Sequence, residues 1–216
     1  MSEYKIGIKE AISYGWNVMK TNLGYFIGVL LVAVLVNVGL NSIPEIFTEQ
    51  NAVTGAITLL ISLIAVVVGA IIEIGFIKIA LKLIDNVKAK VNDLFVHYKY
   101  FIKYLIGSVL YGLIVLGGFL LLIVPGIIWT LQFQFYSCLI IDKGMGPIEA
   151  LKKSSEITKG YKWQLFLLAI ALVGINILGM LVFFVGLFAT VPTSLIGYIY
   201  VYRKLVNRVE APATNG

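Results

Sequence analysis

The chain is poor in the residues that most catalytic and metal sites require. It has one cysteine, Cys138, and one histidine, His97. A lone cysteine excludes an internal disulfide and a cysteine metal cluster. There is no nucleophile–base pair, glycine-rich phosphate loop or zinc motif. We therefore expect no enzyme activity, no metal and no cofactor.

Charge is also scarce. Charged residues make up 13% of the chain and apolar residues 60%, whereas a soluble domain is roughly 25% charged. So little polar surface cannot coat a globule of 216 residues, and lipid must cover much of it. In a soluble protein, a net charge of +6 would suggest nucleic-acid binding. Here it lies between apolar runs, so we expect membrane lipids and no nucleic acid as partners.

Long apolar runs are abundant. A helix of about 20 residues crosses a hydrocarbon core of about 30 Å, and two of the runs are shorter than that. With extension into the flanking interface, they predict an all-α integral membrane protein with six transmembrane helices. The runs cover residues 23–40, 56–77, 104–124, 127–141, 163–184 and 187–201.

The basic residues fall only in alternate connections between these runs. They precede the first run, separate the second from the third and the fourth from the fifth, and follow the sixth. Lysine and arginine accumulate on the cytoplasmic side of a membrane. The pattern predicts a multi-pass protein of the cytoplasmic membrane with both termini inside.

Three inner segments, residues 8–20, 93–103 and 147–159, mix apolar and basic residues at helical spacing. Each predicts an amphipathic helix at the inner interface, ahead of a hairpin of two spans. Pro125-Gly126 and Gly186 are predicted to form tight outer turns. A single domain, residues 1–207, would then hold three approximate repeats, and residues 208–216 a polar tail. The repeats would cover residues 8–84, 92–141 and 147–205.

Glu73 is the charged residue lying well inside a predicted span. Acids within the membrane commonly form proton or cation sites. Glu73 also lies five residues before Lys78, near the end of its helix. A structural role, reaching the interface or pairing with a lysine, stays open.

Four amides add polar groups to the spans: Asn37, Gln132, Gln134 and Asn176. Such side chains hydrogen-bond neighbouring helices, at about 0.5–2 kcal/mol each. The alternative is a polar substrate path. Convergence of these amides and Glu73 on one cavity would favour the path.

A basic cluster precedes the fifth run. Lys152, Lys153, Ser154, Lys159 and Lys162 could hold an anionic lipid headgroup, because basic groups at this depth attract anionic lipid. An ordinary solvated loop on the positive side is the alternative.

Several motifs around this cluster resemble known families. They are Val124-Pro125-Gly126-Ile127-Ile128, Asp142, the stretch from Glu149-Ala150-Leu151 to Ser154, and Thr158-Lys159-Gly160 leading to Trp163. They resemble six-span prokaryotic membrane-protein families of unknown function, related to the membrane domain of glycerophosphoryl diester phosphodiesterase. The resemblance implies a prokaryotic membrane protein and no particular activity, since the phosphodiesterase catalytic domain is absent from this chain.

Together these features predict a non-catalytic scaffold or accessory subunit that binds lipids or other membrane proteins. The alternative is a small transporter or channel that uses Glu73 and the polar residues of the spans. Homo-oligomerisation is open.

Overall fold

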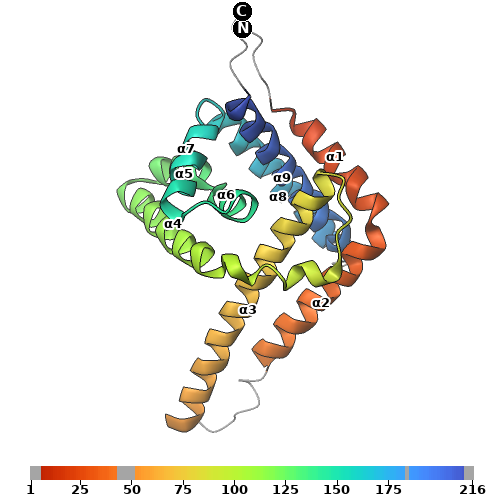
Figure 1. The fold of residues 1–216 in the computed structure, drawn as a ribbon, viewed down its shortest axis with the longest axis vertical. Helices are drawn as coiled ribbons and strands as arrows, with labels where there is room; N and C mark the ends of the chain where they lie inside the picture. The colour runs from red at the N-terminus through yellow and green to blue at the C-terminus, as the bar shows by residue number, and fades with distance from the viewer. Residues whose placement is uncertain (1–5, 43–51, 183–184, 212–216) are drawn as a thin grey trace, which may run out of the picture.

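The computed structural model describes residues 6–42, 52–182 and 185–211, apart from the side chains of Asn37, Leu40, Asn41 and Ala52. The described residues form helices and no strand (Figure 1). In chain order the helices are α1 (Ile8–Thr21), α2 (Leu23–Ser42), α3 (Ala52–Ile84), the short 3-10 helices η2 (Val91–Leu94) and η3 (Tyr98–Tyr100), α4 (Phe101–Leu121), α5 (Ile123–Phe133), α6 (Tyr136–Lys143), α7 (Pro147–Ile157), α8 (Lys162–Leu181) and α9 (Leu187–Glu210).

The all-α, membrane-compatible architecture is confirmed. Four described segments are long and apolar enough to cross a membrane, namely Val53–Ile84, Val91–Leu121, Ile123–Lys143 and Lys162–Leu181. A fifth is reached if α1 and the start of α2, bent by 89°, count as one span. Because α9 is not among them, the count of six and the three-hairpin arrangement stay predictions. Most of the connection expected between the first two spans, residues 41–55, lies outside the described residues, as does the tail from residue 212, whereas residues 208–210 of the expected tail belong to α9.

The turn between α4 and α5 differs from the expectation. The reversal occurs at Leu122, whose backbone is extended, and Pro125 and Gly126 lie inside α5. Proline is tolerated there because the first turn of a helix has no acceptor for its amide groups. Gly126 lets α5 approach α4, since a Cβ on Gly118 would lie 2.9 Å from the Gly126 Cα.

Of the three expected inner helices, α1 and α7 form as single helices, but residues 93–103 do not. There η2 and η3 precede α4. The Asp93 carboxylate accepts hydrogen bonds from the Lys90 backbone amide and the Lys82 amine, both at 2.7 Å. Such side-chain bonds to the local backbone compete with helix formation.

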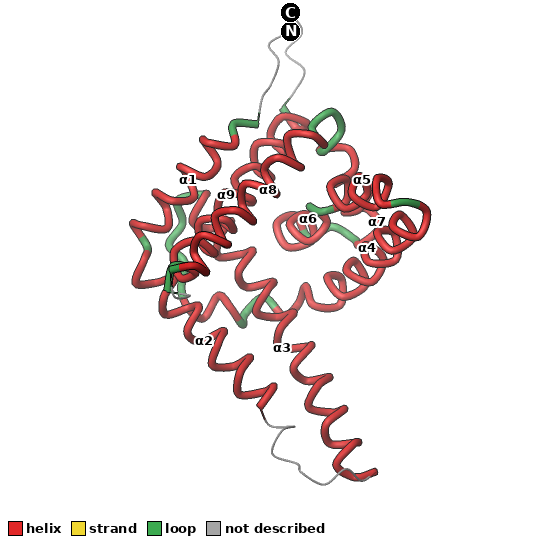
Figure 2. The backbone as a smooth tube through the Cα atoms, turned by 180° about the vertical axis from the view of Figure 1, so that it is seen from behind, coloured by secondary structure: helices red, strands yellow, loops and turns green. Residues whose placement is uncertain are grey.

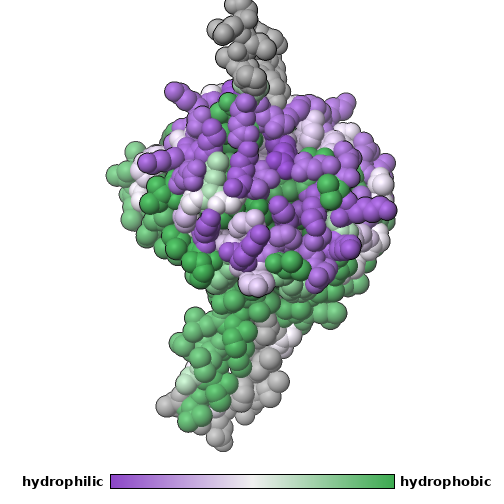
Figure 3. Space-filling view, viewed as in Figure 1, coloured by the Kyte–Doolittle hydropathy of each residue, from purple (hydrophilic) through white to green (hydrophobic). Residues whose placement is uncertain are grey.

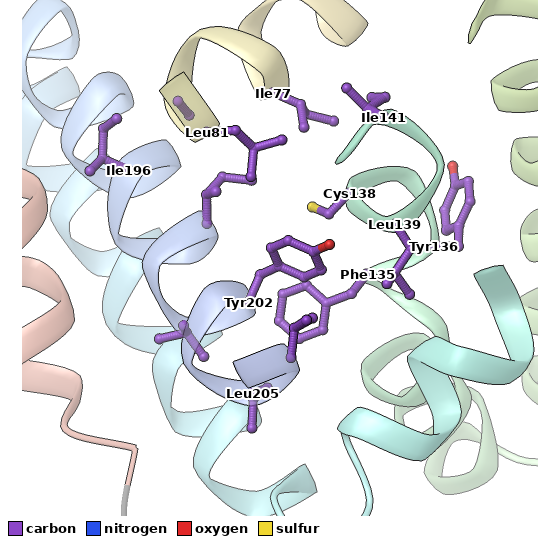
Figure 4. Packing of buried hydrophobic residues seen from close by; sticks show 14 of the residues in the cluster. Ile77, Leu81, Phe135, Tyr136, Cys138, Leu139, Ile141, Ile196, Tyr202 and Leu205 are labelled. Carbon is purple, nitrogen blue, oxygen red and sulfur yellow. The ribbon is translucent and has the colours of Figure 1, made fainter. Parts of the chain in front are cut away.

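The body of the molecule surrounds α6, which lies between α9 on one side and α4 and α7 on the other (Figures 1 and 2). Tyr202 of α9 packs against Phe135, with ring centroids 5.8 Å apart. Cys138 and Leu139 of α6 fill the space beside them (Figure 4). α2 and the first half of α3 extend away from this body.

Hydrophilic side chains gather on the face of the body seen in Figure 3, whereas the extending parts of α2 and α3 are apolar there. We call this the polar face and define it by the described residues whose ion pairs join different elements of the chain. They are Glu10, Lys82, Asp85, Asp93, Asp142, Lys143, Arg203, Lys204 and Glu210.

A close crossing joins α1 to α9. Ala11, Gly15 and Met19 are buried on one side of α1, and Gly15 faces Gly197 of α9. A Cβ on Gly15 would overlap the carbonyl oxygen of Thr193, and a Cβ on Gly197 would lie 3.0 Å from the carbonyl oxygen of Ala11. The two helix backbones therefore touch where neither residue has a side chain.

We predict that Gly15→Ala lowers the stability of the purified protein by about 1–3 kcal/mol, the usual cost of overpacking. Gly24→Ala is the matched control, because nothing lies within 4 Å of a Cβ there and alanine favours helix. Thermal unfolding in detergent measures both. Equal melting temperatures for the two variants would contradict the crossing.

Candidate functional site

The span formed by α5 and α6 is broken at Gln134 and Phe135, and α7 supplies hydrogen-bond partners at the break. The Phe135 backbone N–H donates to Ser154 Oγ at 3.1 Å, and that hydroxyl donates to the Gln132 carbonyl oxygen at 3.0 Å. The Thr158 hydroxyl also donates to the Gln132 carbonyl, at 3.0 Å. Ser154 and Thr158 are fully buried. Two hydroxyls of α7 therefore replace helical partners that the break removes.

Two further backbone groups at the break have side-chain partners. The Gln134 side-chain nitrogen, Nε2, donates to the Leu131 backbone carbonyl at 2.9 Å. The Tyr198 hydroxyl donates to the Gln134 backbone carbonyl at 3.0 Å. An unpaired backbone group in an apolar environment is costly. Since each of these groups is paired, the break is a built feature of the fold.

Gln132 also organises a polar cluster between α5, α7 and α8. Its amide nitrogen donates to Ser155 Oγ at 2.7 Å, and its Oε1 accepts from the Lys162 amine at 2.6 Å. Sequence reasoning placed Gln132 and Lys162 in separate candidate groups, and the structure brings them together.

The predicted headgroup-binding residues do not form one patch. Ser154 is buried at the helix break. Lys153 pairs with Glu156 at 3.0 Å, whereas Lys152 and Lys159 are exposed. Lys162 is partly buried beside Gln132. Ser154 in this conformation is therefore unable to reach a headgroup, and lipid binding by the lysines stays a prediction.

Glu73 is exposed on α3 and interacts with the Tyr104 hydroxyl of α4. No ion pair links it to a lysine within the described part of the chain. Ser108 Oγ and the Tyr136 hydroxyl lie 2.9 Å apart nearby, and Tyr111 stacks on Tyr136 at 5.0 Å. Three tyrosines, Tyr104, Tyr111 and Tyr136, thus lie near Glu73. This grouping was not predicted, because the residues are far apart in the sequence.

The remaining amides lie elsewhere. Asn176 donates to the Leu172 carbonyl and to Ser194 Oγ, each at 3.0 Å, and so links α8 to α9. Asn37 belongs to α2, but its side chain lies outside the described residues. Glu73, Gln132 and Asn176 therefore contact different sets of partners.

Ion pairs on the polar face were missed by sequence reasoning. Arg203 donates to Asp142 at 2.6 Å and to Asp85 at 2.5 Å, and so ties α9 to α6 and to the end of α3. Asp142 also accepts a hydrogen bond from Tyr202 at 2.9 Å. The signal in the sequence was Asp142 itself, an acid directly after an apolar run.

A more exposed pair joins α1 to α9. The Glu10 carboxylate accepts hydrogen bonds from Lys204 at 2.7 Å and from the Tyr200 hydroxyl at 2.5 Å. These bonds, the one from Lys204 first, lower the pKa of the Glu10 carboxyl below its ordinary value. Glu10 is thus held ionised at neutral pH.

Comparison with known proteins covers this same region. Residues 118–209 match the sequence model of a family described as "Protein of unknown function (DUF975)". Uncharacterized proteins of Mycobacterium bovis and of Mycobacterium tuberculosis are each 30% identical over 99 residues, which is 46% of this chain and 30% of theirs. The similarity is to proteins of unknown function.

The matched segment thus covers less than a third of those mycobacterial proteins. No solved structure matches the chain significantly. The family match, residues 118–209, includes the motifs from Val124 to Trp163, and with them the broken span and α7. They show no link to the membrane domain of glycerophosphoryl diester phosphodiesterase, so that resemblance stays a prediction.

We predict that Ser154→Ala destabilises the protein by about 1–3 kcal/mol, because the buried Phe135 backbone amide loses its hydrogen-bond acceptor on α7. Ser13→Ala, at an exposed position of α1, is the control. Thermal unfolding in detergent measures both, and a Ser154→Ala protein as stable as the control would contradict this role for α7.

Arg203→Met should destabilise the protein by about 3–5 kcal/mol, because it leaves the Asp142 carboxylate without its cation, and the Asp142 side chain is only 9% exposed. Lys204→Met, which breaks the exposed pair with Glu10, should cost about 0–1 kcal/mol. Unfolding temperatures of the two variants in one detergent provide the comparison. The reverse order would be incompatible with Arg203 as the stronger tie.

Proposed function

We propose that the protein is a non-catalytic, multi-pass protein of a prokaryotic cytoplasmic membrane that binds lipids or other membrane proteins, as a scaffold or accessory subunit. The observation that supports this most is the dispersal of polar groups among the apolar helices. Gln132 bonds to α7 and α8, Asn176 bonds to α9, and Glu73 meets α4. Polar groups that line a substrate path would share one cavity.

The polar face adds support. Its ion pairs tie the ends of α1, α3, α6 and α9 to one another. Exposed lysines such as Lys9, Lys88 and Lys152 lie on segments next to these ends. We assign this face to the cytoplasm, since lysine-rich connections stay on that side. A face that is tied together by ion pairs and flanked by exposed lysines at the inner leaflet suits binding better than transport.

A second candidate function is a small transporter or channel. The observation that favours it is the meeting of Glu73 with the Tyr104 hydroxyl, beside Ser108 and Tyr136. An acid among hydroxyls inside apolar helices can bind a proton or a cation. The two candidates differ in whether the protein carries flux.

A flux measurement separates them. Purified protein in sealed liposomes, with an internal pH dye and an imposed potassium or sodium gradient, should give no ion flux above protein-free liposomes. Glu73→Gln should then change nothing. Flux in the wild type that is lost in Glu73→Gln but kept in Glu156→Gln, an exposed acid of α7, would favour the transporter instead.

A photo-crosslinking amino acid tests the binding side of the proposal in the native membrane. Placed at Lys152, it should give a reproducible adduct with one protein or one lipid, at a constant molar ratio of adduct to protein. At Ile170, an exposed apolar position of α8, it should give only general lipid adducts. Identical adduct patterns from the two positions would argue against a binding role for the polar face.

A further inference from the structure

An open groove lies between α5 and α8, next to the helix break. Its volume is about 430 Å³, within the range of about 300–1,000 Å³ typical of small-molecule sites. Its walls are apolar except at Lys162, and Leu131 is largely buried in the floor. The residues lining it are Val124, Ile127, Ile128, Leu131, Lys162, Trp163 and Phe166.

The lysine at this groove is bound to a neutral acceptor. The Lys162 amine donates to Gln132 Oε1 at 2.6 Å, and an amide oxygen is a neutral acceptor. Within the described residues no acidic side chain forms an ion pair with Lys162. The bond to Gln132 fixes the position of the ammonium group and leaves its positive charge uncompensated.

Other cations lie at the same junction of α7 and α8. Lys159 is exposed three residues before Lys162. The Arg208 guanidinium of α9 lies over the Tyr161 ring, 4.4 Å from its centroid. Two further basic residues thus lie close to Lys162, one in sequence and one against its neighbour Tyr161.

Trp163 places the Lys162 end of the groove at the membrane interface. Its side chain is 68% exposed and stacks on Phe166 with ring centroids 5.5 Å apart. Tryptophan concentrates where the hydrocarbon core meets the headgroups. The apolar part of the groove then faces acyl chains, and Lys162 lies at headgroup level.

We propose that this groove binds one acyl chain of an anionic phospholipid, with the lipid phosphate at Lys162. This inference rests on the proposed function, which includes lipid binding, and specifies the class of lipid that is bound. The apolar walls select an alkyl chain, which a free phosphate lacks. The uncompensated lysine selects a net negative headgroup over a zwitterionic one, in which an ammonium group opposes the lysine.

Trp163 itself is the probe. In a protein carrying Trp16→Phe and Trp129→Phe, the fluorescence of Trp163 is measured in vesicles of phosphatidylcholine with rising fractions of brominated-chain phosphatidylglycerol or brominated-chain phosphatidylcholine. Brominated phosphatidylglycerol should quench at the lower fraction. Lys162→Met should reduce this preference about fivefold, which corresponds to about 1 kcal/mol for one lysine at the surface.

Two variants serve as controls. Lys162→Arg keeps the charge and should keep the preference, and Lys99→Met removes an exposed lysine that does not line the groove and should also keep it. Phosphatidylglycerol retained by the full wild-type chain after delipidation, quantified by mass spectrometry against Lys162→Met, repeats the comparison with all tryptophans present. It should be severalfold higher in the wild type.

Equal quenching by the two brominated lipids, or an equal loss of preference in Lys162→Met and Lys99→Met, would overturn the proposal. Displacement of the brominated lipid by glycerol phosphate alone would also overturn it, since the site would then be one for free phosphate. Ion flux in the liposome assay would refute the proposed function and leave the lipid preference unaffected. The two failures are therefore distinguishable.

Discussion

The rest of the structure depends on satisfying the backbone groups that are freed where α5 gives way to α6. In an apolar environment these groups find no water, so side chains must pair with them. Ser154 and Thr158 of α7 pair with the Gln132 carbonyl, and Ser154 also accepts from the Phe135 amide. This requirement fixes α7 against the broken span. It thereby brings Gln132, Ser155 and Lys162 together beside the groove of α5 and α8.

A second consequence of the apolar surroundings is the separation of charge. The ion pairs of the described residues lie at helix ends, where Arg203 joins α9 to α6 and α3. The long apolar segments keep few polar groups, and among these Gln132 and Asn176 donate hydrogen bonds to neighbouring helices. The molecule thus combines a face tied together by ion pairs with apolar helices that diverge from it, among which α2 and α3 extend furthest (Figures 1 and 2).

Sequence patterns predicted the apolar helices well, because length and composition alone decide whether a helix suits lipid. The helix break was not predictable, since residues 127–141 read as one continuous run and its partners lie on α7. Pro125 was misread as a turn residue, although it fits the first turn of α5. The expected helix at residues 93–103 was wrong because Asp93 binds the Lys90 amide instead. Lys162 was identified from its charge. Its position beside an apolar groove follows from the packing of α5 against α8 and was not visible in the sequence.

The central claim is that the polar face is the cytoplasmic side of a membrane protein. Cysteine labelling tests it most directly, because Cys138 is buried and can be replaced by serine. Single cysteines at Lys9, Lys88, Lys152 and Asn207 should react with a membrane-impermeant maleimide only after the cells are permeabilised. A cysteine at Glu49, in the connection between the first and second predicted spans, should react in intact cells. Labelling of any of these four positions in intact cells would contradict the account.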